Sequence, residues 1–136
     1  MSKEVVIVSA VINFQYNVWC DLYGASSIEN IPFLNVFEKF VDLSISLHTS
    51  GPLMQWLQTN HPDYLNRIAQ LVEAGRIEII GGAFYEPILP MIPRRDRVGQ
   101  ITRFTKWLNE RVCSSVNGMW MPERVWESCL TESLAD

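Results

Sequence analysis

The stretch GRIEIIGGAFYEP, residues 75–87, contains a helix stop, a short strand and a strand end in direct succession. Gly75 follows apolar residues at i, i+3, i+4 spacing, as is typical of the glycine just beyond a helix. Ile77 to Ile80 reads as a short strand with three isoleucines, and Gly81-Gly82 ends it. A helix, a strand and a loop in this order indicate that strands and helices alternate along the chain.

The same alternation extends to both sides of this stretch. Strands are predicted at residues 5–10, 41–47, 77–80 and 116–121, and residues 11–30 are expected to form a long excursion. Helices are predicted from Ile31 to Phe40, from Gly51, from Pro62 to Val72, from Pro93 to Val112 and near Trp126. The helix that Pro93 opens is expected to bury Val98, Ile101, Thr105, Leu108 and Val112. Alternating strands and helices imply parallel pairing with right-handed crossovers.

The composition is that of one globular domain. Of the 136 residues, 48% are hydrophobic and 19% are charged, which argues against disorder. The net charge of -4 argues against nucleic-acid binding and against an anionic membrane surface. No apolar stretch approaches the roughly 20 residues of a membrane span. Arg94, Arg95 and Arg97 cluster at a predicted helix start, where we expect a solvated face.

The number of predicted strands bounds the architecture. A closed (β/α) barrel takes about 250 residues, whereas this chain offers about four strand units. The sequence therefore predicts an α/β fold forming part of a TIM-like (β/α)7 barrel, with residues 1–136 as the N-terminal part of the barrel domain, apparently truncated.

The cysteines carry no metal or disulfide signature. Cys20, Cys113 and Cys129 are odd in number and lack CxxC spacing. They predict reduced, buried thiols in a cytoplasmic protein.

Polar side chains follow three of the predicted strands. His48 follows the second strand, Glu86 the third and Glu123 the fourth. The carboxyl ends of parallel strands meet at one edge of a sheet, so we expect these side chains to converge. Two carboxyl groups suit glycoside chemistry, in which one attacks the anomeric carbon and the other protonates the leaving oxygen. Aromatic rings that could bind a sugar face stand nearby, at Tyr85, Trp120 and Trp126.

Each of these residues also has a structural explanation. Glu86 precedes a proline and could be a loop carboxylate that accepts hydrogen bonds from backbone amides. Glu123 could form an ion pair with Arg124 at a helix start. His48 could be structural, and both tryptophans could be core residues. The residues alone leave these alternatives open.

Three segments resemble glycoside hydrolase family 57, the α-amylase and 4-α-glucanotransferase group. They are SLHTSGPL at 46–53, GRIEIIGGAFYEP at 75–87 and WMPERVW at 120–126, and the resemblance extends over about residues 5–136. It implies a (β/α)7 barrel that acts on α-1,4-glucans, such as a maltooligosaccharide, with retention and without a metal or other cofactor.

The resemblance also implies roles for three residues. Under it, Glu123 matches the catalytic nucleophile, Glu86 a substrate-binding acid and Trp120 an aromatic beside the nucleophile. His48, Trp126 and Tyr85 complete the set of expected substrate-binding residues.

Two departures from the family pattern bear on activity. The family's first strand ends in His-Gln-Pro, whereas residues 8–14 contain no histidine and Gln15 is the nearest polar residue. The family's acid/base is an aspartate on a later strand, so no residue here is assigned that role. We therefore expect the nucleophile-bearing part of a glucan-processing enzyme, inactive alone, with a complementing C-terminal chain or self-association as its partner.

Two other functions compete with this one. A non-catalytic glucan-binding or assembly module would keep the aromatic residues and would not need the missing histidine. A metal-dependent deacetylase or mannosidase on a related barrel would need clustered Asp and His ligands. The chain offers only His48 and His61 for that chemistry.

Overall fold

The computed structural model describes residues 11–14, 30–112 and 115–134, and these form one parallel sheet with helices packed against it. The strand order is β1-β2-β3-β4, so each strand pairs with the next one in the chain. The strands are β1 (Val11–Phe14), β2 (Ile45–Thr49), β3 (Ile77–Gly81) and β4 (Gly118–Met119). The predicted parallel pairing of alternating strands and helices is confirmed.

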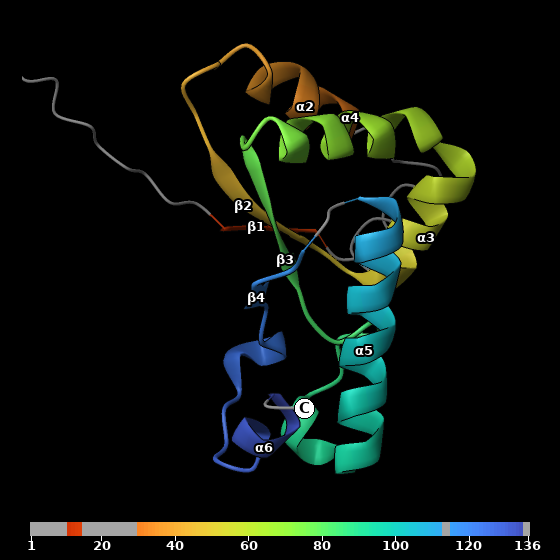
Figure 1. Cartoon of the computed structure of the whole chain (residues 1–136), viewed down its shortest axis with the longest axis vertical. Helices are drawn as coiled ribbons and strands as arrows, with labels where there is room; N and C mark the ends of the chain where they lie inside the picture. Colours follow the sequence, from red (N-terminus) through yellow and green to blue (C-terminus); the bar gives the residue numbers. More distant parts are fainter. Residues whose placement is uncertain (1–10, 15–29, 113–114, 135–136) are drawn as a thin grey trace, which may run out of the picture.

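Helices connect consecutive strands. The α-helices are α2 (Asn30–Phe37), α3 (Gly51–Asn60), α4 (Pro62–Glu73), α5 (Arg94–Arg111) and α6 (Leu130–Leu134). Two single 3₁₀ turns, η2 (Leu89–Met91) and η3 (Pro122–Arg124), interrupt the loops that follow β3 and β4. Both α4 and α5 pack against β3, and α6 packs against α5 (Figure 1).

The main core lies between the strands and these helices. Leu47 and Ile79 from the sheet are almost fully buried, as are Ile68 from α4 and Phe104 and Leu108 from α5. The side of α4 that faces the core has the predicted spacing, with Tyr64, Leu65, Ile68 and Leu71 buried. Gly75 has φ +69°, which confirms the left-handed residue expected just beyond that helix.

The expectation of an irregular excursion over residues 11–30 was wrong at its start. The strand β1 occupies Val11–Phe14, which we expected to begin an irregular excursion. Residues 5–10, where the strand was expected, lie outside the described residues. The run from Val5 to Phe14 is almost entirely apolar, so its pattern gave no reason to end the strand at Ala10.

The second strand begins four residues later than predicted. Because α2 ends at Phe37, turns occupy the next residues and β2 starts only at Ile45. Val41 and Leu43, expected in the strand, have exposed fractions of 72% and 44%. Their apolar alternation therefore did not mark a strand.

The last two elements also differ from the prediction. The strand β4 covers only Gly118–Met119 within the expected 116–121, and the final helix begins at Leu130 and not near Trp126. The turn η3 takes up the intervening chain and carries Glu123.

The buried side of α5 differs from the expected stripe. Phe104 has an exposed fraction of 0% and Arg97 of 8%, whereas Val98, Ile101 and Thr105 are only partly buried.

Candidate functional site

His48 lies near the carboxyl end of β2 and is fully buried. Its Nδ1 lies 2.9 Å from the carbonyl oxygen of Ile80 on β3, and its Nε2 lies 2.9 Å from Oε1 of Glu86. Both ring nitrogens are therefore engaged. The parallel register of β2 and β3 explains the first contact, because His48 pairs with Ile80 in the sheet.

The chain after β3 turns sharply to bring Glu86 back to His48. Gly82 allows this turn, because a Cβ at that position would lie 3.2 Å from His48 Cε1 and from the Trp120 carbonyl oxygen. The Glu86 amide then donates to the Ala83 carbonyl at 3.1 Å, which closes a turn with Glu86 at φ 52°. The Glu86 side chain is 11% exposed. Its carboxyl group accepts no described bond from a backbone amide, which was one alternative for this residue.

Trp120 lies just beyond the end of β4, at the same edge of the sheet. Its amide donates to the Gly81 carbonyl at 2.9 Å, so the chain remains bound to β3 for one more residue. Its ring stacks on His48, with 5.9 Å between centroids and 22° between planes. The edge of Phe104 meets the same imidazole at 6.2 Å. The imidazole therefore packs against one aromatic residue just beyond β4 and one from α5.

Glu123 is exposed at the same edge of the sheet, three residues after Trp120. It has φ 52° inside η3, and Arg124 follows at φ 57°. Within the described residues Glu123 forms no ion pair, and the alternative of a pair with Arg124 is not observed. A carboxylate that is accessible and unpaired can act as a nucleophile or accept hydrogen bonds from a ligand.

Tyr85 and Trp126 present their rings to solvent, with exposed fractions of 57% and 55%. Tyr85 leans toward α5, where Arg103 Nη1 donates to its hydroxyl at 3.2 Å and the guanidinium lies 5.3 Å from its ring centroid. No described contact joins Trp126 to the group formed by His48, Glu86 and Trp120. The structure therefore brings these three together and leaves Tyr85 and Trp126 outside the group.

Backbone strain is concentrated in the same loops. Among the described residues other than glycine, positive φ angles occur only at Glu86, Glu123 and Arg124. Such residues are uncommon and gather at functional sites. The residue type gives no signal for this conformation, so the sequence did not predict it. Sequence reasoning also missed Phe104 as a residue that packs on His48.

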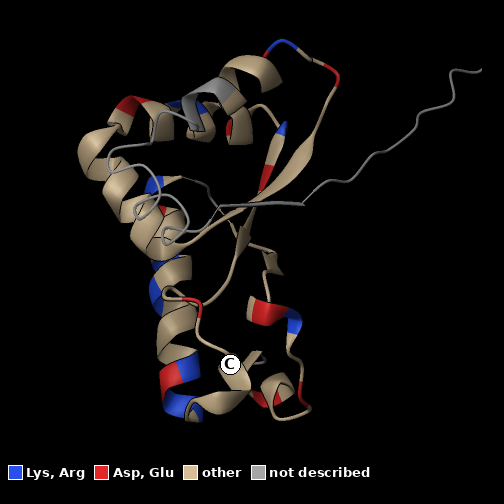
Figure 2. Ribbon diagram, turned by 180° about the vertical axis from the view of Figure 1, so that it is seen from behind, with Lys and Arg blue, Asp and Glu red and all other residues tan. Residues whose placement is uncertain are grey.

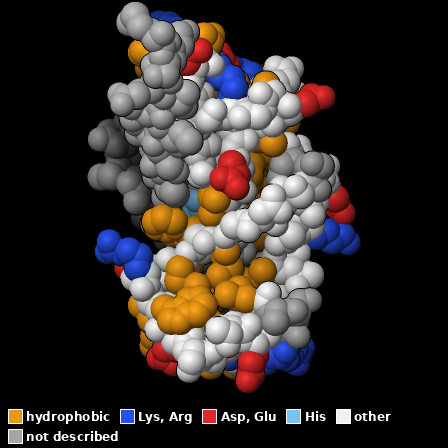
Figure 3. All heavy atoms as spheres, turned by 60° about the vertical axis from the view of Figure 1, so that its left-hand side comes forward, with side chains coloured by type: hydrophobic (Ala, Val, Ile, Leu, Met, Phe, Trp, Pro, Cys, Tyr) orange, Lys and Arg blue, Asp and Glu red, His pale blue; other side chains and the backbone are white. Residues whose placement is uncertain are grey.

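A hollow with hydrophobic side chains lies on one face of the molecule, in the lower half of Figure 3. The smaller buried cluster consists of Ala83, Leu89 and Leu130, with Ile92, Ile101, Met119 and Met121 packed against it. This cluster packs the loops after β3 and β4 against α5 and α6.

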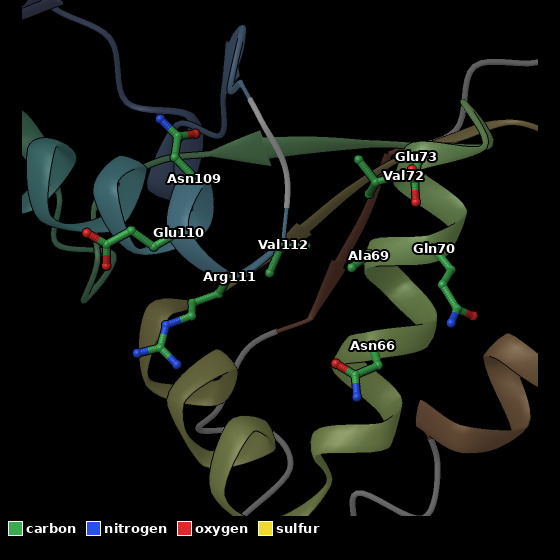
Figure 4. Close-up of a pocket in the computed structure, with 9 residues that line it drawn as sticks. All are labelled: Asn66, Ala69, Gln70, Val72, Glu73, Asn109, Glu110, Arg111 and Val112. Atoms are coloured by element: carbon green, nitrogen blue, oxygen red, sulfur yellow. The ribbon is translucent and has the colours of Figure 1, made fainter.

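An open cavity of about 840 Å³ lies elsewhere, between α4 and α5 (Figure 4). It is lined by Asn66, Ala69, Gln70, Val72, Glu73, Asn109, Glu110, Arg111 and Val112. These residues lie toward the C-terminal ends of both helices, which lead into the amino ends of strands. In parallel α/β folds that edge contributes to stability, whereas catalysis is placed at the opposite edge. We therefore place the candidate site at His48, Glu86 and Glu123.

Charged residues of both signs occur together over the described chain, including at the start of α5 (Figure 2). The expectation of a solvated arginine cluster holds for Arg94 and Arg95 but was wrong for Arg97. Arg97 is buried, and its Nη1 donates to Cys129 Sγ at 3.0 Å. Cys129 is exposed, which contradicts its expected burial. Cys20 and Cys113 lie outside the described residues.

The described residues lack two further features. They contain no group of three His, Cys, Asp or Glu side chains close enough together to hold a metal ion. Among their helices, none combines the length and the apolar character that crossing a membrane requires.

Comparison with known proteins matches the chain to one family. The model of glycosyl hydrolase family 57 matches residues 20–136. Alpha-amylase 1 of Dictyoglomus thermophilum is 43% identical over 105 residues, which cover 77% of this chain and 15% of that protein. The 4-alpha-glucanotransferase of Thermococcus litoralis is 37% identical over 105 residues, again 77% of this chain and 16% of that protein.

The fold comparison agrees with the sequence comparison. The crystal structure of 4-alpha-glucanotransferase from Thermococcus litoralis matches with a TM-score of 0.79 and 30% sequence identity. The match covers 96% of this chain and 21% of that one. The chain thus spans only 15% to 16% of the length of the curated relatives named above.

Proposed function

The chain belongs to glycosyl hydrolase family 57, and we propose that it supplies the nucleophile side of a retaining active site for α-1,4-glucans. Its relatives include an alpha-amylase and a 4-alpha-glucanotransferase, so the proposed substrate is an α-glucan or a maltooligosaccharide. The observation that carries the proposal is Glu123, an exposed carboxylate without an ion pair in the described chain, at the sheet edge that holds Glu86 and Trp120.

Each group has a role in the proposed reaction. Glu123 attacks the anomeric carbon and forms a covalent glycosyl-enzyme, which water or a second sugar then cleaves with net retention. Glu86 accepts a hydrogen bond from a sugar hydroxyl, and the Trp120 ring forms one wall of the site. The proposed barrel continues the sheet of four strands described here with further strands of the family domain.

The proposal assigns no general acid within this chain. The family resemblance implies an aspartate on a strand later than the four described here. General acid catalysis contributes typically 10²–10⁴-fold, so a polypeptide of these 136 residues alone should turn over glucan poorly or not at all. A complementing chain that carries such an aspartate is the proposed partner.

A chimera tests the assignment of Glu123. Residues 11–134 would replace the matching segment of the Thermococcus litoralis 4-alpha-glucanotransferase, whose fold this chain shares. Maltooligosaccharide turnover would be compared for the parent chimera, Glu123→Gln and the control Glu132→Gln, an exposed carboxylate on α6. We expect Glu123→Gln to lose about 10³-fold or more in kcat and Glu132→Gln to keep the parent rate.

Anion rescue identifies the role more sharply than loss of rate does. In Glu123→Ala, azide can enter the space of the carboxylate and attack the anomeric carbon, which gives a β-glycosyl azide. Formation of that product supports a nucleophile at position 123. A Glu123→Gln chimera as active as its parent would overturn the proposal.

The exposed rings of Tyr85 and Trp126 favour a second candidate, a glucan-binding module without catalysis. Both rings are accessible without any further strand, and exposed aromatic faces suit sugar stacking. The two functions separate in one experiment. The binding module is favoured if the chain is retained on amylose, if this retention is lost in Tyr85→Ala and Trp126→Ala, and if the chimera shows no turnover.

A further inference from the structure

His48 is placed where it can support the site but cannot touch a sugar. It was expected among the substrate-binding residues, yet its exposed fraction is 0% and both ring nitrogens already have partners. Trp120 stacks on the imidazole and the Phe104 ring packs perpendicular to it. Any effect of His48 on a ligand must therefore pass through another residue.

The two hydrogen bonds fix where the protons of the imidazole can be. A carbonyl oxygen only accepts, so the 2.9 Å contact with Ile80 requires a proton on Nδ1. The second contact, between Nε2 and Glu86 Oε1, is also 2.9 Å and needs one proton between its two atoms. The pair is then either imidazolium with carboxylate or neutral imidazole with a protonated carboxyl group. In both states one proton joins His48 to Glu86.

We propose that His48 is a positioning residue that holds Glu86 through this shared proton, so that one carboxyl oxygen is fixed and the other is left for the ligand. Oε1 is the oxygen that His48 engages, and Oε2 accepts no hydrogen bond within the described residues. The backbone of Glu86 is in the left-handed region, at φ 52°. The buried imidazole therefore holds in place a side chain whose own backbone conformation is unfavourable.

The backbone around the pair fits this role. Gly82 lets the loop pass within van der Waals distance of the imidazole, since a Cβ there would lie 3.2 Å from His48 Cε1. The register of β2 with β3 orients Nδ1 at Ile80, and the turn from Ala83 to Glu86 returns the carboxyl group to Nε2. The pair thus links β2, β3 and the loop after β3 at the edge that carries the candidate site. This inference rests on the proposed function for the identity of the ligand, and not for the pair itself.

Nitrogen NMR tests the protonation pattern without any ligand. The chain contains two histidines, so His61→Gln leaves His48 as the only imidazole signal. We expect a proton on Nδ1, and we expect Glu86→Ala to shift the Nε2 resonance much more than the Nδ1 resonance. A neutral imidazole with its proton on Nε2 and none on Nδ1 would overturn the proposal.

Two substitutions separate the bond to Glu86 from the bond to Ile80. The amide nitrogen of Gln can reach the position of Nε2, whereas that of Asn reaches only the position of Nδ1. In the chimera, with maltoheptaose as the probe, His48→Asn should raise KM about tenfold or more with a smaller change in kcat. His48→Gln should keep KM within about threefold of the parent.

The outcomes distinguish this inference from the proposed function. If circular dichroism shows both variants to be folded and their KM values are equal, the positioning role of His48 is wrong. Loss of the proposed function would instead appear as a parent chimera with no turnover or with an active Glu123→Gln variant. The NMR result stands in either case, because it requires no substrate.

Discussion

Substitution of Gly51 by alanine should destabilise the fold through one buried ring. Gly51 is the first residue of α3, and its amide donates to the Phe84 carbonyl at 3.0 Å. A Cβ at this position would lie 2.5 to 2.7 Å from three atoms of the Phe84 ring. These distances are far below van der Waals contact, so the ring or the helix start must move.

Phe84 has little freedom to move away. Its exposed fraction is 0%, the Phe104 ring meets it edge-on at 5.8 Å, and the Arg103 guanidinium lies 4.1 Å from its centroid. Overpacking of this kind costs typically about 1–3 kcal/mol. We expect Gly51→Ala to lower the free energy of unfolding by about 2 kcal/mol, because the first position of a helix returns little of the alanine propensity.

Gly99 provides the matched control. It lies inside the 18-residue α5, it is exposed, and a Cβ there would meet no atom within 4 Å. Gly99→Ala should therefore raise the free energy of unfolding by up to about 1 kcal/mol. Thermal melts followed by circular dichroism would measure both, and a change of 1 kcal/mol corresponds to roughly 3–6 °C in Tm for a domain of this size.

The prediction is that the two substitutions change the free energy of unfolding in opposite directions. If Gly51→Ala were as stable as the wild type, or gained stability as Gly99→Ala does, the close approach of α3 to Phe84 would be wrong. The site gives a second readout, because Phe84 stands two residues before Glu86. A displaced Phe84 should therefore weaken glucan affinity in Gly51→Ala and leave it unchanged in Gly99→Ala.

Two further predictions concern packing and pH. Phe104→Ala should lower the free energy of unfolding by about 3–5 kcal/mol, measured by urea denaturation, because the ring is fully buried; a loss below about 1 kcal/mol would contradict its place in the core. Arg67 donates two hydrogen bonds to Glu38 and so lowers the pKa of that carboxyl group below 4.5. The stabilisation from this pair is therefore present above the unfolded-state pKa and lost as pH falls through the lowered value. This stabilisation should be at most about 1 kcal/mol, since both side chains are partly exposed and screened. Wild type should therefore be more stable than Glu38→Gln at neutral pH, and the difference in the free energy of unfolding should disappear in acid.

The approach of Glu86 to His48 was predictable because it depends on strand order. His48, Glu86 and Glu123 each follow an apolar run, and the alternation of strands and helices places all three at one edge. Gly75 and Pro62 marked helix boundaries for equally local reasons, since one adopts a positive φ and the other lacks a backbone donor. Local chemistry thus determined where α4 begins and where the chain leaves it.

Tertiary packing decided what the sequence left open. Arg97 looked solvated beside Arg94 and Arg95, yet it is buried because α5 brings it against Cys129. Phe104 carried no more signal than any other apolar residue of α5, although it alone of that helix meets His48 in the described contacts. Such pairings depend on how a helix rotates over the sheet, which a pattern within one helix does not contain.

The edge that carries the candidate site holds all the positive φ angles that the described residues other than glycine adopt. Glu86 and Glu123 adopt a backbone conformation that costs a residue with a side chain about 1–2 kcal/mol. Selection for stability alone would remove such features, whereas a site that must present carboxyl groups in a fixed geometry can retain them. The strain lies in the loops after β3 and β4, and His48 holds the first of these loops through Glu86. The strained backbone of Glu86 and the bond that holds its side chain therefore occur in one residue. This coincidence supports the proposal that Glu86 and Glu123 are held in a fixed geometry for a ligand.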